Sequence, residues 1–185
     1  MGTEVYHVLK AALKKQGLSV GVGDEGGFAP HIKTSEAALK ELEKAVKASG
    51  YVMRKDFKVG MDVASSEFYN ASSKKYEGTF SGKKATSMNM VKIYKKLVSQ
   101  FPIEIIEDGM AEDDFLGWKM LTQEIGQQTL LVGDDLFVTN PERLQAGITQ
   151  KMANALLVKP NQIGTLSETI TAIKLAQANG YSIVI

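Results

Sequence analysis

The sequence contains no cysteine, and this absence excludes disulfide bonds and thiolate metal sites. Its two histidines, His7 and His31, have no partner at the spacing of metal ligands. No apolar run approaches the roughly 18 residues that a membrane-spanning helix needs. The 22 basic and 21 acidic residues nearly balance, and no basic run is longer than a pair, so nucleic acid is not expected as the main partner. We expect a cytoplasmic chain without a membrane span.

Length and periodicity indicate one domain in which helices and strands alternate. A chain of 185 residues with 44% hydrophobic content can bury one ordinary core. Apolar residues at helical spacing, bounded by capping residues and glycine, predict helices over residues 4–16, 35–50, 87–100, 113–125, 141–150 and 166–179. Short apolar runs predict strands over residues 58–62, 103–107, 130–134, 155–159 and 181–185.

The order of these elements favours a parallel sheet. From Glu107 onward a strand–helix unit recurs about every 25 residues, the pattern of right-handed crossovers. Periodicity alone leaves an open doubly wound sheet and a (β/α) barrel as alternatives. The polar stretch 64–85 between the first two strands is interpreted as a surface insert, with a small hairpin around residues 76–80 as the alternative.

Four of the predicted strands end on a charged residue, namely Asp62, Glu107, Asp134 and Lys159. Because alternate residues of a strand share a face, Asp62 lies on the face of Gly60, and each of the other three lies on the face of the apolar residues two and four positions before it. Parallel strands of a barrel bring such ends to one mouth. Three carboxylates gathered there repel one another unless a hard cation lies between them. The pattern therefore predicts a metal site with an amine beside it.

A glycine-rich segment, Gly21 to Gly26, fits the letters of the dinucleotide fingerprint G-x-G-x-x-G. That motif needs a helix directly after the glycines, whose N–H groups bind the pyrophosphate. Here Phe28-Ala29-Pro30 follows, and no helix is expected before about Thr34. Asp24 and Glu25 would also place two negative charges against the phosphates. The nucleotide interpretation is therefore rejected.

Five ordered segments are similar to one known family. They are residues 22–30 (VGDEGGFAP), 61–69 (MDVASSEFY), 105–114 (IIEDGMAEDD), 131–143 (LVGDDLFVTNPER) and 157–168, with VKPNQIGTLSE at its core. Through these segments, essentially all of the chain resembles enolase, and the motifs are most similar to those of the bacterial forms. The resemblance implies the (β/α) TIM-like barrel of the enolase C-terminal domain. It also implies a lyase of glycolysis that reversibly dehydrates 2-phosphoglycerate to phosphoenolpyruvate.

The resemblance also implies roles for the charged residues. Asp62, Glu107 and Asp134 match the family's magnesium ligands, and hard oxygen donors suit Mg²⁺. Lys159 matches the base that removes the C2 proton, the Lys-plus-magnesium arrangement general to this superfamily. Glu25 matches the acid that protonates the leaving hydroxide. Asp135 adjoins Asp134, but strand alternation is expected to turn it the other way.

Departures from the family are as informative as the matches. Relative to enolases, we expect this chain, residues 1–185, to be an incomplete C-terminal barrel that lacks the N-terminal domain and the last strand or strands. The segment that grips the substrate phosphate is absent with them. A catalytically incompetent fragment or a non-catalytic binding protein is therefore the alternative to the lyase. We expect a homo-oligomer for the full-length parent and, by family resemblance, a secondary cell-surface location as an alternative to the cytoplasm. Another superfamily activity, an acid racemase or cycloisomerase, is disfavoured by the motifs GDEGG and LVGDDLFVTN.

Overall fold

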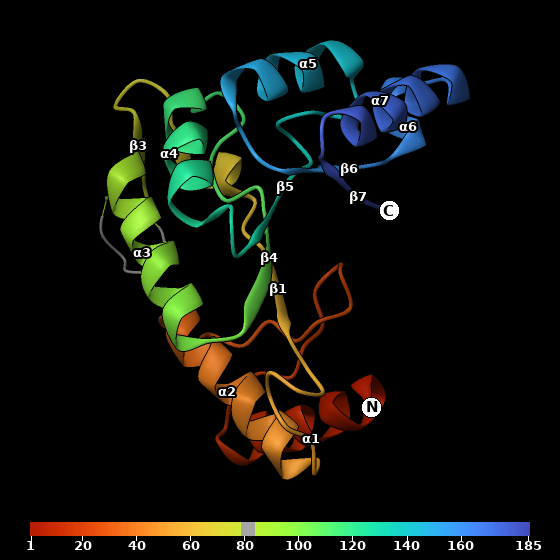
Figure 1. Ribbon diagram of the computed structural model, residues 1–185. Helices are drawn as coiled ribbons and strands as arrows, with labels where there is room; N and C mark the ends of the chain where they lie inside the picture. The colour runs from red at the N-terminus through yellow and green to blue at the C-terminus, as the bar shows by residue number, and fades with distance from the viewer. Residues whose placement is uncertain (79–83) are drawn as a thin grey trace. The chain divides into compact units, whose positions relative to one another are not determined.

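The computed structural model describes residues 1–78 and 84–185 and divides the chain into two compact units, Met1–Lys58 and Val59–Ile185 (Figure 1). Within the described ranges no helix combines the length and apolar character needed to cross a membrane. Each unit is described in turn.

The first unit consists of two helices and the long connection between them. Helices α1 (Gly2–Lys15) and α2 (Ser35–Ala48) pack through a core of Val5, Ala45 and Val46. The Thr34 hydroxyl accepts the N–H of Ala37 and caps α2, so this helix begins where the sequence predicts it. Since α2 is the first helix after the glycine-rich segment, the prediction that no helix begins before about Thr34 is confirmed.

The glycine-rich segment forms a compact loop with hairpin-like hydrogen bonds. Val22 and Phe28 make an antiparallel bridge, and the N–H of Gly23 donates to the carbonyl of Gly27 at 2.9 Å. Gly26 has φ +80°, a backbone conformation that glycine adopts without steric cost. The loop therefore presents Asp24 and Glu25 at an exposed tip.

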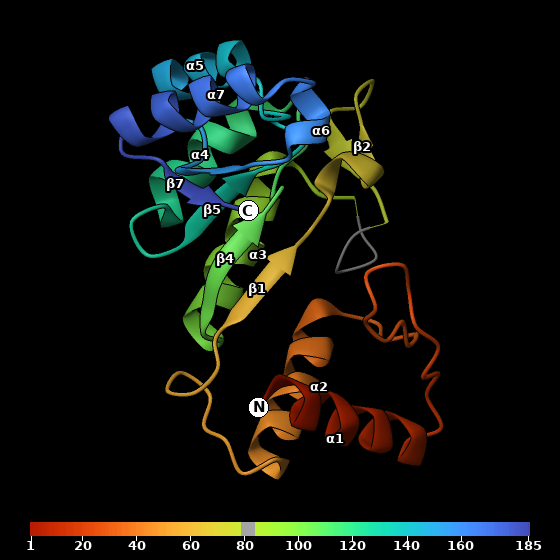
Figure 2. The ribbon, with the colours of Figure 1, turned by 90° about the vertical axis from the view of Figure 1, so that its right-hand side faces the viewer.

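The second unit contains a five-stranded, fully parallel sheet that forms an open, partial barrel (Figure 2). Its strand order is β1-β4-β5-β6-β7. The bounds are β1 (Val59–Asp62), β4 (Ile103–Glu107), β5 (Leu130–Gly133), β6 (Ala155–Leu157) and β7 (Ser182–Val184). The prediction of an α/β fold built as a partial barrel is confirmed, because the five strands lie in the sheet in the same order as they occur along the chain.

Helices connect the strands, and four of them follow their predicted positions closely, namely α3 (Ser87–Gln100), α4 (Phe115–Ile125), α5 (Pro141–Gln150) and α7 (Leu166–Ala178). Two short helices were not predicted, η1 (Ser65–Phe68) and α6 (Pro160–Ile163). Side-chain caps fix their starts, as where Asn140 accepts N–H groups of α5 before its first residue, Pro141. The side chain of Trp118 on α4 is fully buried.

The two faces of the sheet differ in what covers them. Ile106, Leu131 and Leu156, on adjacent strands, have no exposed surface and form the outer face, where the helices pack (Figure 2). The opposite, inner face is an apolar cluster made by Val132, Ala155 and Leu157, with Ile105, Leu130 and Val184 packed against it. This inner face is the one that the charged strand ends were predicted to share.

The polar stretch after β1 is more ordered than the surface insert that the sequence suggested. It contains a short antiparallel hairpin, β2 (Tyr69–Asn70) with β3 (Lys75–Tyr76), which begins several residues earlier than the alternative interpretation placed it. Thr79 and Phe80, part of that interpretation, lie outside the described residues. The Tyr76 side chain is fully buried, and its hydroxyl donates to Asp114 at 2.7 Å. The insert is therefore anchored to α4 through Asp114, which also caps that helix.

Candidate metal and proton-transfer site

Strand register brings the predicted site residues to one edge of the sheet. Asp62 is the strand partner of Glu107, and Glu107 is the partner of Val132. Asp134 follows Val132 by two positions, just after β5 ends at Gly133. Partnered residues of parallel strands point to the same face. Asp62 and Glu107 thus lie side by side at the carboxyl edge of the inner face, and Asp134 follows directly after the end of the next strand.

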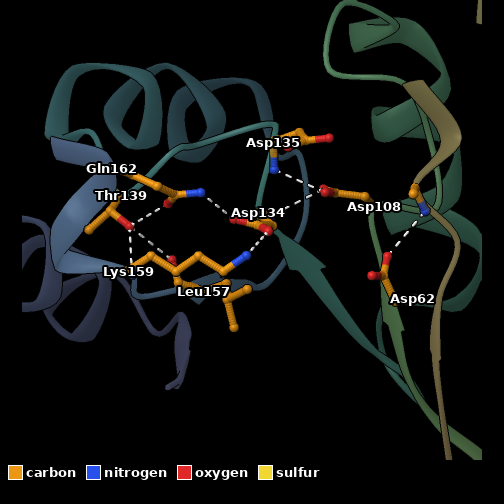
Figure 3. Close-up of polar contacts among 9 residues, drawn as sticks. Asp62, Asp108, Asp134, Asp135, Thr139, Leu157, Lys159 and Gln162 are labelled. Atoms are coloured by element: carbon orange, nitrogen blue, oxygen red, sulfur yellow. Dashed lines mark hydrogen bonds and ion pairs between the residues drawn. The ribbon is translucent and has the colours of Figure 1, made fainter. Parts of the chain in front are cut away.

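The closest contact at this edge joins Asp134 and Lys159 (Figure 3). Lys159 Nζ lies 2.5 Å from Asp134 Oδ2, and the Asp134 side chain is only 11% exposed. The other oxygen, Oδ1, accepts a hydrogen bond of 2.7 Å from Gln162 Nε2. Both donors come from the segment after β6, since Lys159 caps α6 and Gln162 belongs to it. The geometry therefore places the predicted base against a predicted metal ligand.

The carboxylates determine the protonation of this amine. The bond to Asp134 raises the pKa of Lys159, and the charges of Asp134, Glu107 and Asp135 act in the same direction, while burial opposes them. Lys159 is therefore an ammonium group at neutral pH in the metal-free protein. Three carboxylates beside an amine favour its charged form, which accounts for this direction.

Asp108 is a residue of this edge that the sequence analysis missed. It has φ +41° and a buried side chain. Its two carboxylate oxygens accept the backbone N–H groups of Asp134 and Asp135, at 3.0 and 2.9 Å. Burial raises the pKa of Asp108 to about 7, and these two hydrogen bonds oppose the rise. Asp108 thus ties the end of β4 to the turn that carries Asp134, and its position beside Glu107 is the only signal for it in the sequence.

Carboxylate oxygens of Asp108, Asp134 and Asp135 lie within 4.8 Å of one another, close enough to share one ion. Asp135 was expected to turn away from Asp134, but β5 ends at Gly133, so strand alternation does not extend into the turn that holds both residues. Both oxygens of Asp108 already accept backbone N–H groups, so Asp108 is better suited to position this turn than to bind a cation. Asp134 belongs both to this cluster and to the predicted triad.

The two remaining carboxylates of the predicted triad have different surroundings. Asp62 is exposed, and its Oδ1 accepts the N–H of Ala64 at 3.1 Å. Its charge contributes to raising the pKa of Asp135, after burial and Asp134, so it acts on the Asp134–Asp135 turn. Glu107 is half-buried and acts on Lys159 in the same way. The charges of this edge therefore influence one another.

Oxygen donors of this kind fit a divalent cation. The set contains carboxylates and no sulfur or imidazole, which is the preference of Mg²⁺. Asp62, Glu107 and Asp134 could supply the ligands, with Asp134 oriented by its contacts to Lys159 and Gln162. Glu25, the predicted acid, belongs to the first unit, at the exposed tip of its glycine-rich loop.

A comparison with protein families agrees with this architecture. The whole chain, residues 1–185, matches the family described as enolase, C-terminal TIM barrel domain. This chain belongs to that family. Membership supports a lyase activity of the enolase superfamily and a small-molecule substrate, and the acidic edge of the sheet agrees with the metal dependence typical of such domains.

Proposed function

We propose that this domain takes part in the dehydration of 2-phosphoglycerate to phosphoenolpyruvate, the reaction of phosphopyruvate hydratase, in bacterial-type glycolysis. The observation that carries the proposal is the contact of Lys159 with Asp134 at the carboxyl ends of adjacent parallel strands. Barrel enzymes carry their chemistry at this edge. Membership of the enolase domain family supports the interpretation of this amine as a base and of the carboxylates as metal ligands.

Lys159 is the proposed base. It removes the proton from C2 of the substrate, and the electron pair of that C–H bond moves toward the neighbouring carboxylate. Because Asp134 and Glu107 hold the lysine in its charged form, the amine becomes available only when their negative charge is offset. Lys159 can therefore act as a base only when a cation occupies the acidic edge of the sheet.

Asp62, Glu107 and Asp134 are the proposed ligands of Mg²⁺. A bound divalent cation would neutralise the negative charge that builds on the substrate carboxylate and would supply several kcal/mol of stabilisation. The protein's part is to hold the three carboxylates at one edge, with Asp62 and Glu107 on paired strands and Asp134 in the turn directly after β5.

Glu25 is the proposed acid. Hydroxide is a poor leaving group, so a carboxylic acid that protonates it at C3 completes the elimination, with water as the product and a C2–C3 double bond formed. Gly26 and Gly27, which directly follow Glu25, let the backbone of the loop come close to a ligand.

Two exchange measurements on the protein encoded by the whole gene test these roles. We expect Lys159→Ala to abolish exchange of the C2 proton of 2-phosphoglycerate in D₂O with Mg²⁺ present. Glu25→Gln should slow the formation of phosphoenolpyruvate, followed by its absorbance, much more than it slows the exchange. Persistent exchange in Lys159→Ala, or equal slowing of both steps in Glu25→Gln, would contradict the assignments.

The same absorbance assay on the 185-residue chain decides between the lyase and a non-catalytic fragment. We expect no turnover from this chain by itself, because the family's phosphate-gripping segment is not among its residues. Turnover by the protein of the whole gene would support the proposed reaction. If that protein leaves 2-phosphoglycerate unchanged, another acid substrate of the superfamily becomes the better candidate.

A further inference from the structure

Thr139 is held in an unfavourable conformation at the centre of the site. It ends the turn after β5, has no exposed surface, and has φ +57°. A β-branched residue adopts positive φ only where its surroundings compel it, at a cost of about 1–3 kcal/mol. The contacts of the Thr139 side chain therefore distinguish this residue from the others of the turn.

The Thr139 hydroxyl connects the turn after β5 to the segment after β6. Its oxygen accepts the backbone N–H of Lys159 at 2.9 Å. Its single proton can be donated to Gln162 Oε1 at 2.9 Å or to the carbonyl of Leu157 at 3.3 Å. One buried hydroxyl thus fixes the backbone of the lysine and the direction of a glutamine side chain (Figure 3).

That direction decides what Gln162 offers to Asp134. With Oε1 accepting from Thr139, the amide nitrogen is turned toward Asp134 Oδ1 and donates at 2.7 Å. The reversed amide would place an oxygen against an ionised carboxylate, which only accepts hydrogen bonds. Gln162 therefore holds Oδ1, while Oδ2 faces Lys159 Nζ.

We infer that Thr139 and Gln162 form a positioning clamp that sets Asp134 and Lys159 relative to each other. This inference rests on the proposed function, in which those two residues are metal ligand and base. Neither member of the clamp needs to touch the substrate. Groups that orient the ligands of a metal site commonly alter metal affinity by about 10–100-fold when they are changed.

Binding of Mn²⁺ to the chain, followed by the electron paramagnetic resonance of the free ion, tests the clamp. We expect Gln162→Met and Thr139→Val each to weaken Mn²⁺ binding by about 10–100-fold, and Thr139→Ser, which keeps the hydroxyl, to stay close to wild type. Gln145 and Thr149 provide matched controls, since they form an exposed glutamine–threonine contact on α5 at 3.4 Å. Gln145→Met and Thr149→Val should leave the affinity unchanged.

A melting curve for each variant separates positioning from folding. Gln162 is half-buried on a four-residue helix, so Gln162→Met should melt near the wild-type temperature while its Mn²⁺ affinity falls. An affinity like that of the wild type in this variant would overturn the clamp. An equal fall in affinity in Gln162→Met and Gln145→Met would overturn it as well.

A second measurement needs no metal and distinguishes failure of the clamp from failure of the proposed site. In the ¹⁵N-labelled protein the side-chain amide protons of Gln162 should exchange with solvent more slowly than those of Gln145. If the wild-type chain takes up no Mn²⁺, the proposed metal site fails, and the amide exchange then decides the clamp. Slow exchange at Gln162 supports it, and equal rates at the two glutamines refute it.

Discussion

Replacing Gly147 by alanine sets two effects of known size against each other. Gly147 lies in the interior of α5, where alanine is favoured over glycine by about 1 kcal/mol. The added Cβ, however, would lie 2.4 Å from Cε1 and 2.8 Å from Cζ of Phe137. Carbon atoms pack best at about 3.5–4.0 Å, so the overlap exceeds about 1 Å.

The Phe137 ring has no room to move away from the new methyl group. It is fully buried, and on its other side a Cβ at Gly133 would lie 2.6 Å from Cδ2. The ring thus fills a slot between two glycines, one at the end of β5 and one on α5. Overpacking of this kind costs about 1–3 kcal/mol, against about 1 kcal/mol gained from the helix preference. We expect Gly147→Ala to lower the free energy of unfolding by up to about 2 kcal/mol.

Urea unfolding followed by tryptophan fluorescence measures this effect in the second unit. The chain has one tryptophan, Trp118, and it is buried in α4 of that unit. Gly2→Ala is the control, because a Cβ at Gly2 on α1 would have nothing within 4 Å. The double variant Gly147→Ala, Phe137→Leu should lose less stability than the sum of its single changes. A gain in stability for Gly147→Ala would show that Phe137 does not fill this slot.

Two further predictions concern buried tyrosines. Tyr76→Phe should lower the free energy of unfolding by about 1–3 kcal/mol, because it leaves the N–H of Ala111 without its acceptor at 3.1 Å and removes a donor from Asp114. Tyr6→Phe is the control, since the Tyr6 hydroxyl makes only a long, exposed contact, and it should change the urea midpoint little. Equal effects of the two changes would contradict the reasoning. Burial raises the pKa of Tyr181 to about 12, so its contribution to stability is complete below the ordinary pKa of about 10 and is lost as pH rises through 12. The wild type should therefore be more stable than Tyr181→Phe by an amount that decreases between pH 10 and pH 12. A difference in unfolding free energy that stays constant over this range would refute the raised pKa of Tyr181.

Much of the fold could be predicted from the sequence because its signals are local. Each strand of the parallel sheet is a short apolar run, and these observed strands fall within the predicted ones. Helix starts were predictable where a side chain caps the first turn, as at Thr34 and Asn140. Parallel order followed from the spacing of these elements. All of these signals depend on residues close together in the chain.

The predictions failed where the decisive contact is distant in sequence. The stretch after β1 is polar in composition, yet Tyr76 is buried because Asp114, far along the chain, accepts its hydroxyl proton. Strand alternation was carried past Gly133 into a turn, where it does not set the direction of Asp135. Asp108, with its positive φ, has no repeating pattern that marks it.

The candidate site shows the same division between local and distant information. Its charged residues were visible as strand ends, but the groups that orient them are single polar residues reached across the sheet. Asp134 is fixed through its backbone by Asp108, from the end of β4, and through its side chain by Gln162, from α6. Since β5 ends before Asp134, the strand itself does not set the direction of this carboxylate. Changes to these neighbours should therefore disturb metal binding more than they disturb the fold.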